Sequence, residues 1–327
     1  MTSVKLLNVR NIQHLTPSTP FHFDSSFYKP AHFPSSDNTW RPGARWQTML
    51  WQGKNLGLLF ENDGTVEEPG INLSIWSEDE LSNTFLDQLI QEICYRYALN
   101  LDLSKFYQQF RDDPLLGPAL IRWRGMRPLN CGSLYEYLII AIVLQNATVR
   151  RTVNMMQVLF ENYGIQVSYD NREFYCFWAP ERIEQVTEQE LRNLKVGYRA
   201  KSIKQVSEAF SKKQIDEYDL RQRSYDEQRK SLLDLYGIGP ASVGYILSDV
   251  FHYLDELNYI SPWEQKIYSK LFFDVDPEDP LPTGKLLNYF KERFGEFRSI
   301  AVLYIWDDLF WKWKNEGIEW LDKLIRL

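Results

Sequence analysis

The sequence predicts an α+β protein: an N-terminal antiparallel β-sheet with helices, followed by an all-α bundle built around a two-glycine helical hairpin. Short runs rich in β-forming residues, bounded by glycine-containing turn signals, occur only before about residue 80. Beyond about residue 129 the apolar residues follow a helical period. We therefore divide the chain into an α+β domain (1–112), a linker (113–128) and a helical region (129–327) with its hairpin at 229–251.

The first domain reads as an antiparallel meander followed by two helices. Ser77-x-x-Glu80 has the form of a capping box, so we expect it to open a helix that runs to about Ala98. A second helix is expected from Leu103 to Phe110. The predicted strands are Trp46–Trp51, Asn55–Glu61 and Ile71–Trp76.

The helical region begins with Ser133–Leu144, which is almost wholly apolar and is therefore expected to be a buried central helix. The amphipathic helix Val149–Tyr163 follows, and residues 165–180 read as an irregular loop rich in aromatic residues. Thr187-x-x-Glu190 is expected to cap a short helix. Further helices are predicted at Ala200–Phe210, Pro262–Phe272, Leu286–Phe294, Ser299–Lys314 and Ile318–Ile325.

Composition limits the class of protein. The 327 residues suffice for two or three domains, and no apolar run reaches membrane-spanning length. Cys94, Cys131 and Cys176 lie far apart, which predicts a reducing compartment and no iron–sulfur cluster or other metal site. The N-terminus lacks a signal pattern, so we expect a cytoplasmic protein, nucleoid-associated if prokaryotic. A net charge of −7 argues against a highly basic nucleic-acid binder without excluding a local DNA-binding face.

The segment from Leu235 to Gly239 (LYGIG) is a two-glycine hairpin between the predicted helices Arg229–Leu235 and Pro240–Phe251. Glycine allows another backbone to approach closely, and Pro240 suits the first helical turn. The free N–H groups at the start of the second helix would suit a phosphate. Taken alone, this pattern is more often a simple tight connection between helices.

Four motifs occur in the order found in one family of DNA repair enzymes. The motifs are Leu134 to Thr148, Val196 to Lys201, Gly237-Ile238-Gly239 with Pro262-Trp263-Glu264, and Phe297 to Trp306. Together they resemble the helix-hairpin-helix (HhH-GPD) DNA glycosylases, most of all the 3-methyladenine DNA glycosylase II type and next the 8-oxoguanine type. The resemblance implies base-excision repair of double-stranded DNA by a monomer, in which a damaged base is flipped into a cleft between helical domains.

The resemblance also implies contacts with DNA. Gly237 and Gly239, with the amides that follow them up to Ser242, would grip the phosphate backbone without reading sequence. Lys266 occupies a second phosphate-contacting position. The remaining positions that the resemblance assigns to DNA are Asn146, as a polar wedge that fills the gap left by the flipped nucleotide, and Tyr198 and Arg199, as contacts to the opposite strand.

Simpler interpretations exist for two of these residues. Asn146 could instead be a helix-capping amide, and Tyr198 could be a core aromatic. The sequence also leaves open whether a monovalent cation binds at the hairpin. No other cofactor is expected.

Glu264 is the candidate catalytic residue, and here the chain departs from the family, in which aspartate is expected. Ser261-Pro262-Trp263-Glu264 is also a complete capping box, so a purely structural role is the alternative. An ionised carboxylate would stabilise the oxocarbenium character that develops on the sugar and could orient or deprotonate water. Because glutamate is one methylene longer than aspartate, both an active enzyme and a catalytically inactive DNA-binding relative remain open.

Three further positions bear on the reaction. Relatives that cut the DNA backbone carry a lysine where this chain has Ala241, which implies a monofunctional glycosylase that leaves an abasic site. Tyr245 and Trp306 match base-pocket positions, and their π faces would attract a positively charged alkylated purine. The pocket should be more open than usual, because its third aromatic would sit at position 241. A non-lyase glycosylase for oxidised purines is the remaining alternative.

Overall fold

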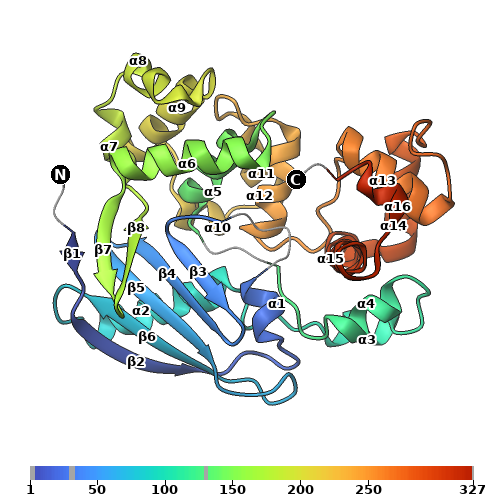
Figure 1. The fold of residues 1–327 in the computed structure, drawn as a ribbon, viewed down its shortest axis with the longest axis horizontal. Helices are drawn as coiled ribbons and strands as arrows, with labels where there is room; N and C mark the ends of the chain where they lie inside the picture. Colours follow the sequence, from blue (N-terminus) through green and yellow to red (C-terminus); the bar gives the residue numbers. More distant parts are fainter. Residues whose placement is uncertain (1–3, 29–33, 129–131, 326–327) are drawn as a thin grey trace.

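The computed structural model describes residues 4–28, 34–128 and 132–325. Figure 1 shows an N-terminal β-sheet, a helical layer above it (α5 to α12) and a separate C-terminal group of helices (α13 to α16). This is the predicted α+β fold. Cys131 lies outside the described residues. Among the described residues, no helix is both long and apolar enough to cross a bilayer.

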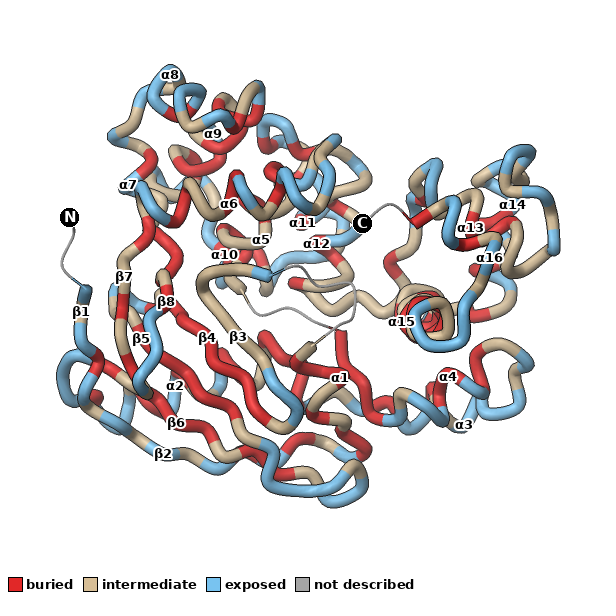
Figure 2. Tube along the Cα trace, in the orientation of Figure 1, coloured by how far each residue is buried: buried red, intermediate tan, exposed pale blue. Residues whose placement is uncertain are grey.

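The main sheet is antiparallel, with strand order β2-β6-β5-β4-β3. The three predicted strands are present, and the sequence did not indicate the two outer ones. The strands are β2 (Val9–Leu15), β3 (Asn38–Arg41), β4 (Ala44–Trp51), β5 (Lys54–Asn62) and β6 (Ile71–Ser77). The buried face packs on α1 (Phe23–Phe27) and α2 (Asn83–Arg96) through an apolar cluster, and Figure 2 shows the central strands as largely buried.

Helix α2 begins later than predicted. Ser77 is the last residue of β6, and the N-cap is Ser82, whose hydroxyl accepts a hydrogen bond from the Phe85 amide at 3.2 Å. The sequence at Ser77 has the capping-box form, but residue 77 is paired with Val9 in the sheet. Strand pairing therefore overrode the local capping signal.

Residues 165–176 form a β-hairpin, so the predicted irregular loop is wrong there. Strand β7 (Ile165–Tyr169) pairs antiparallel with β8 (Arg172–Cys176) and parallel with β1 (Lys5–Leu6). Asp170 and Asn171 both have positive φ, 47° and 56°, as a two-residue type I′ turn requires. The three-stranded sheet packs against β4 and β5 of the main sheet through its own apolar cluster.

The middle of the chain forms one helical layer with a continuous apolar core. Helix α5 is buried as predicted and starts with a capping box formed by Ser133 and Glu136. Thr187 and Glu190 form the capping box predicted for α8. The helices are α5 (Leu134–Leu144), α6 (Val149–Tyr163), α7 (Pro180–Glu184), α8 (Glu188–Leu191), α9 (Arg199–Ser211), α10 (Glu217–Arg221), α11 (Tyr225–Leu233) and α12 (Pro240–Asp249).

A second apolar core holds the C-terminal helices and also includes residues from the expected linker. Segment 113–128 contains α4 (Leu116–Arg122), which packs on α15 (Arg298–Glu316). Asp113 accepts hydrogen bonds from the amides of Leu115 and Leu116 and pairs with Arg293 at 2.7 Å. The other helices of this core are α3 (Ser104–Phe110), α13 (Pro262–Phe273), α14 (Thr283–Phe294) and α16 (Glu319–Asp322). The two helical cores thus form separate bodies, and the candidate site lies where α12 meets α13.

Candidate active site

Glu264 is the third residue of α13, and its side chain completes the capping box that the sequence predicts. The Ser261 amide donates to Glu264 Oε2 at 2.9 Å, and the Glu264 amide donates to Ser261 Oγ at 3.2 Å. The side chain is half-buried. The capping role is therefore real, and it anchors one carboxylate oxygen at the positive end of a helix.

The second carboxylate oxygen of Glu264 faces α12. The Tyr245 hydroxyl donates to Glu264 Oε1 at 3.0 Å, and this bond connects the two helical cores. Burial of the hydroxyl and the adjacent carboxylate raise the pKa of Tyr245, so the phenol stays protonated and remains a donor. Tyr245 nevertheless keeps 48% of its surface exposed, so part of the residue is accessible to a ligand. The two expected site residues thus lie in direct contact.

Trp306 on α15 reaches this site through Trp263. The two indole rings pack edge to face with centroids 5.2 Å apart, and Trp263 immediately precedes Glu264. Trp263 Nε1 donates to the carbonyl of Leu324 at 2.6 Å, so the ring is held although 40% of it is exposed. We did not single out Trp263 from the sequence. Its position in the Pro-Trp-Glu segment was the available signal.

The two hairpin glycines meet different requirements. Gly237 has φ of +81°, and a Cβ built there would lie 2.2 Å from Ser202 Oγ, so this glycine lets the turn pack on α9. Gly239 has φ of −103°, and a Cβ there would meet no atom within 4 Å. Gly239 therefore leaves open space in front of the first turn of α12, where backbone N–H groups have no intrahelical partner. Ser242, in that turn, is partly exposed.

Asn146 and Tyr198 lie together beside the hairpin. Asn146 follows α5, has a left-handed φ of 48° and is exposed, and its amide donates to the Tyr198 hydroxyl at 3.3 Å. Tyr198 keeps 53% of its surface exposed, so it is not a core aromatic. Both side chains are accessible to a ligand that approaches the hairpin.

Arg199 does not present the direct DNA contact that we expected. Its side chain is only 1% exposed, and its guanidinium donates to the Gln145 carbonyl and lies 4.7 Å from the Tyr198 ring centroid. Arg199 is the first residue of α9, so its side chain faces the α5–α6 turn. It supports the Asn146 and Tyr198 surface from beneath.

Two positions on α12 and α13 complete the description. Lys266 forms an ion pair with Glu278, with Nζ–Oε distances of 3.1 and 3.2 Å, so a phosphate would have to compete with that carboxylate. Ala241 places only a methyl group at the position where an amine would be needed for Schiff-base chemistry.

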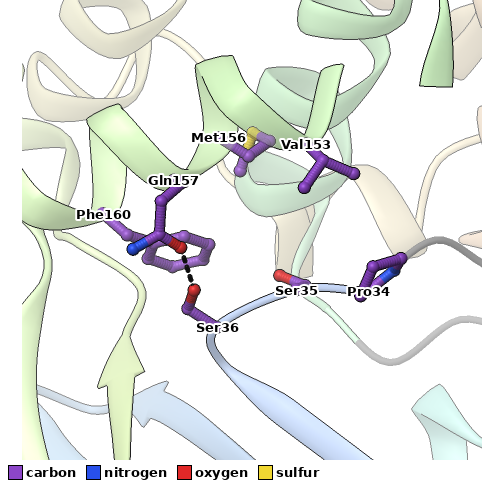
Figure 3. Close-up of a pocket in the computed structure, with 7 residues that line it drawn as sticks. All are labelled: Pro34, Ser35, Ser36, Val153, Met156, Gln157 and Phe160. Atoms are coloured by element: carbon purple, nitrogen blue, oxygen red, sulfur yellow. Dashed lines mark hydrogen bonds between the residues drawn. The ribbon is translucent and has the colours of Figure 1, made fainter. Parts of the chain in front are cut away.

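A cavity of about 220 Å³ lies elsewhere, between α6 and residues 34–36 (Figure 3). It contains none of the candidate site residues and is smaller than most ligand pockets. Among the described residues, His, Cys, Asp and Glu side chains do not gather in groups of three or more that could hold a metal ion.

The chain is similar in sequence and fold to known DNA glycosylases. The chain is 20% identical to a DNA-3-methyladenine glycosylase of Bacillus subtilis, over 68% of this chain and 73% of that protein. It is 24% identical to a probable N-glycosylase/DNA lyase of Methanothermobacter thermautotrophicus, over 67% of this chain and 74% of that protein. The fold matches a solved 3-methyladenine DNA glycosylase from Archaeoglobus fulgidus with a TM-score of 0.73 and 17% identity, covering 91% of this chain and 98% of that one.

A family model supplies the assignment. Residues 139–295, which hold the hairpin and Glu264, match the HhH-GPD superfamily of base excision DNA repair proteins. Residues 139–295 therefore form an HhH-GPD domain of the base excision DNA repair superfamily.

Proposed function

We propose that the protein is a monofunctional DNA glycosylase that hydrolyses the N-glycosidic bond of a flipped-out alkylated purine and leaves an abasic site. The observation that carries this proposal is the contact between Glu264 Oε1 and the Tyr245 hydroxyl at 3.0 Å. It places a carboxylate beside an exposed aromatic face, which are the two groups that cleavage of a cationic nucleotide requires.

The role of Glu264 follows from the charge that develops in the reaction. As the bond from the sugar to the base lengthens, its electron pair leaves with the base and the sugar becomes an oxocarbenium-like cation. The fixed negative charge of Glu264 stabilises that cation, and the carboxylate accepts a proton from the attacking water. Anchoring by Ser261 and Tyr245 limits movement of the carboxylate, so little reorganisation is needed during the reaction.

The preference for alkylated purines rests on the aromatic walls. An alkylated purine carries a positive charge, and the faces of Tyr245, Trp306 and Trp263 attract cations as well as stack on bases. The alkyl-base relatives of Bacillus subtilis and Archaeoglobus fulgidus support the same preference.

The monofunctional assignment rests on Ala241. A lyase needs an amine that attacks the first carbon of the sugar, and a methyl group cannot form a Schiff base. The relative named as a probable N-glycosylase/DNA lyase makes lyase activity the alternative to test.

Base release from defined duplexes tests the whole proposal. Methylated duplex DNA should lose free methylpurine, whereas duplexes with 8-oxoguanine or no lesion should release little. The strand should break only after alkali, and borohydride should trap no covalent adduct. Release of 8-oxoguanine alone would favour the oxidised-purine alternative, and a trapped adduct would make the enzyme a lyase. Duplex binding without release of any base would identify an inactive DNA-binding protein.

A further inference from the structure

Gln145 occupies the junction of three loops, each of which holds a candidate DNA contact. It follows the last residue of α5, where the backbone turns away from the helix, and Asn146 comes next with its left-handed φ. Neither composition nor the motif pattern marks Gln145 for a role. Its contacts distinguish it from other polar residues on this surface.

The side chain of Gln145 bonds to the hairpin. Its Nε2 donates to the carbonyl of Gly237 at 2.8 Å, and the N–H on the other side of that peptide, from Ile238, donates to the Leu235 carbonyl at 3.1 Å. The Gly237–Ile238 peptide plane is therefore held from both sides. This plane lies immediately before Gly239 and the open amides of α12.

The main chain of Gln145 bonds to the third loop. Its carbonyl oxygen accepts a hydrogen bond from the Tyr198 hydroxyl at 3.3 Å and another from the buried guanidinium of Arg199. The Tyr198 hydroxyl in turn accepts a hydrogen bond from the side-chain amide of Asn146 at 3.3 Å. One residue thus connects the Asn146 turn, the Tyr198 turn and the hairpin.

The surroundings make this connection stiff. The hairpin packs on α9 because Gly237 allows contact with Ser202, and Lys201 Nζ lies 4.4 Å from the Tyr236 ring centroid. The turn after Gln145 joins two helices of the same apolar core, α5 and α6. Movement of Gln145 relative to the hairpin would therefore require a break in these hydrogen bonds rather than a bend in a flexible loop.

From this arrangement we infer that Gln145 is a positioning residue that fixes Asn146 in register with the phosphate-binding hairpin, so that DNA backbone binding and base extrusion are coupled. The inference rests on the proposed function, in which Asn146 fills the gap left by the flipped nucleotide. Gln145 does not touch the reacting atoms. Its effect should appear in the extrusion step and not in general duplex affinity.

Gln145→Met tests this coupling, because methionine keeps the length of the side chain and removes the donor to Gly237. The probe is a duplex with 2-aminopurine beside an abasic-site analogue, and the fluorescence rise on mixing reports extrusion. We expect extrusion to slow roughly 5- to 20-fold, which corresponds to the loss of one positioned hydrogen bond. The Kd for undamaged duplex should stay within about twofold of the wild-type value, and Tm should stay within about 2 °C of it. Gln145→Glu places a carboxylate against the Gly237 carbonyl, and because both groups are acceptors it should slow extrusion at least as much.

Asn146→Ala is the matched comparison. If Gln145 works through Asn146, the double variant Gln145→Met/Asn146→Ala should extrude no more slowly than Asn146→Ala alone. Additive losses, or wild-type extrusion by Gln145→Met, would overturn the inference. A parallel loss of undamaged-duplex affinity would make Gln145 part of the phosphate grip instead and would overturn it too.

The fluorescence assay separates this inference from the proposed function. If the wild-type protein extrudes the abasic-site analogue from this duplex but releases no base from methylated duplex DNA, the glycosylase proposal fails and the Gln145 variants still decide the coupling. If the wild-type protein extrudes nothing from this duplex, the coupling inference is overturned.

Discussion

Glu264→Gln separates the catalytic role of this residue from its capping role. The carboxylate accepts two hydrogen bonds, from the Ser261 amide at 2.9 Å and from the Tyr245 hydroxyl at 3.0 Å. In glutamine the amide oxygen can still accept from the Ser261 amide and the NH2 group can donate to the Tyr245 hydroxyl oxygen, so two hydrogen bonds to a charged group become neutral ones, at a cost of about 1 kcal/mol. Loss of the charge from the helix N-terminus adds ~0.3–1 kcal/mol. The variant should therefore lose about 1–2 kcal/mol of folding free energy.

The effect on catalysis should be much larger than the effect on stability. Removal of a fixed charge that stabilises a developing cation should lower single-turnover base release by at least ~100-fold, comparable with loss of an oxyanion-hole donor. Tm should fall by roughly 1–3 °C, because the unfolding entropy of a 327-residue chain is ~0.7 kcal/mol per kelvin and each kcal/mol therefore shifts Tm by ~1.5 °C. Duplex Kd should change by less than about twofold, because Glu264 is not among the expected phosphate contacts. Chromatography of released methylpurine, calorimetry and fluorescence anisotropy measure the three quantities.

Ser261→Ala is the matched control for Glu264→Gln. It removes the capping hydroxyl, which accepts the Glu264 amide at 3.2 Å, and keeps the carboxylate. Loss of such a cap costs about 1 kcal/mol, so Tm should fall about as much as in Glu264→Gln, while most base release survives. Equal loss of activity in both variants would show that helix capping, and not the charge, explains the effect. Wild-type activity in Glu264→Gln would refute the catalytic role outright.

Three other predictions concern the hairpin, the pocket and pH. Gly239→Val should fold normally, because a Cβ at this position meets open space, but it should raise Kd for all duplex sequences by at least about fivefold and lower the salt dependence of binding. Gly237→Val should instead lower Tm, because a Cβ there would collide with Ser202. Tyr245→Phe keeps the ring and should slow base release about tenfold, measured by single turnover, with unchanged duplex Kd. Burial and the charge of Arg221 lower the pKa of His252 from 6.5 to about 4. The folded state therefore favours the neutral imidazole, and this contribution to stability is complete above pH 6.5 and is lost as the pH falls towards 4. The midpoint of urea unfolding should fall less between about pH 7.5 and pH 5 in His252→Gln than in the wild-type protein.

Local sequence signals predicted the helical part of the site well. The capping boxes predicted at Thr187 and Ser261 are both formed, and α6 has the bounds that its amphipathic period indicates. These signals succeed because the groups that satisfy a helix N-terminus lie within four residues of one another in sequence. The position of Glu264 also follows from such a signal, since the Ser261 cap fixes where the side chain begins.

The misplaced elements show where local signals compete with tertiary pairing. Ser77 and Glu80 satisfy the capping pattern, but Ser77 pairs with Val9, which lies far away in sequence. The hairpin at 165–176 did carry a local signal, the adjacent turn formers Asp170 and Asn171. Strand β7 (IQVSY) also alternates apolar and polar residues, so the hairpin could have been predicted from these two signals together.

Arg199 shows most clearly why a motif position does not determine a contact. Its place at the start of α9 matched a DNA-contacting position, yet the side chain turns inward because the Gln145 carbonyl at the end of α5 accepts its guanidinium. That carbonyl is 54 residues away in sequence. Arg199 and Tyr198 are neighbours in sequence, and only Tyr198 remains exposed. Whether a basic residue binds phosphate or supports a loop therefore depends on which acceptor the fold places within its reach.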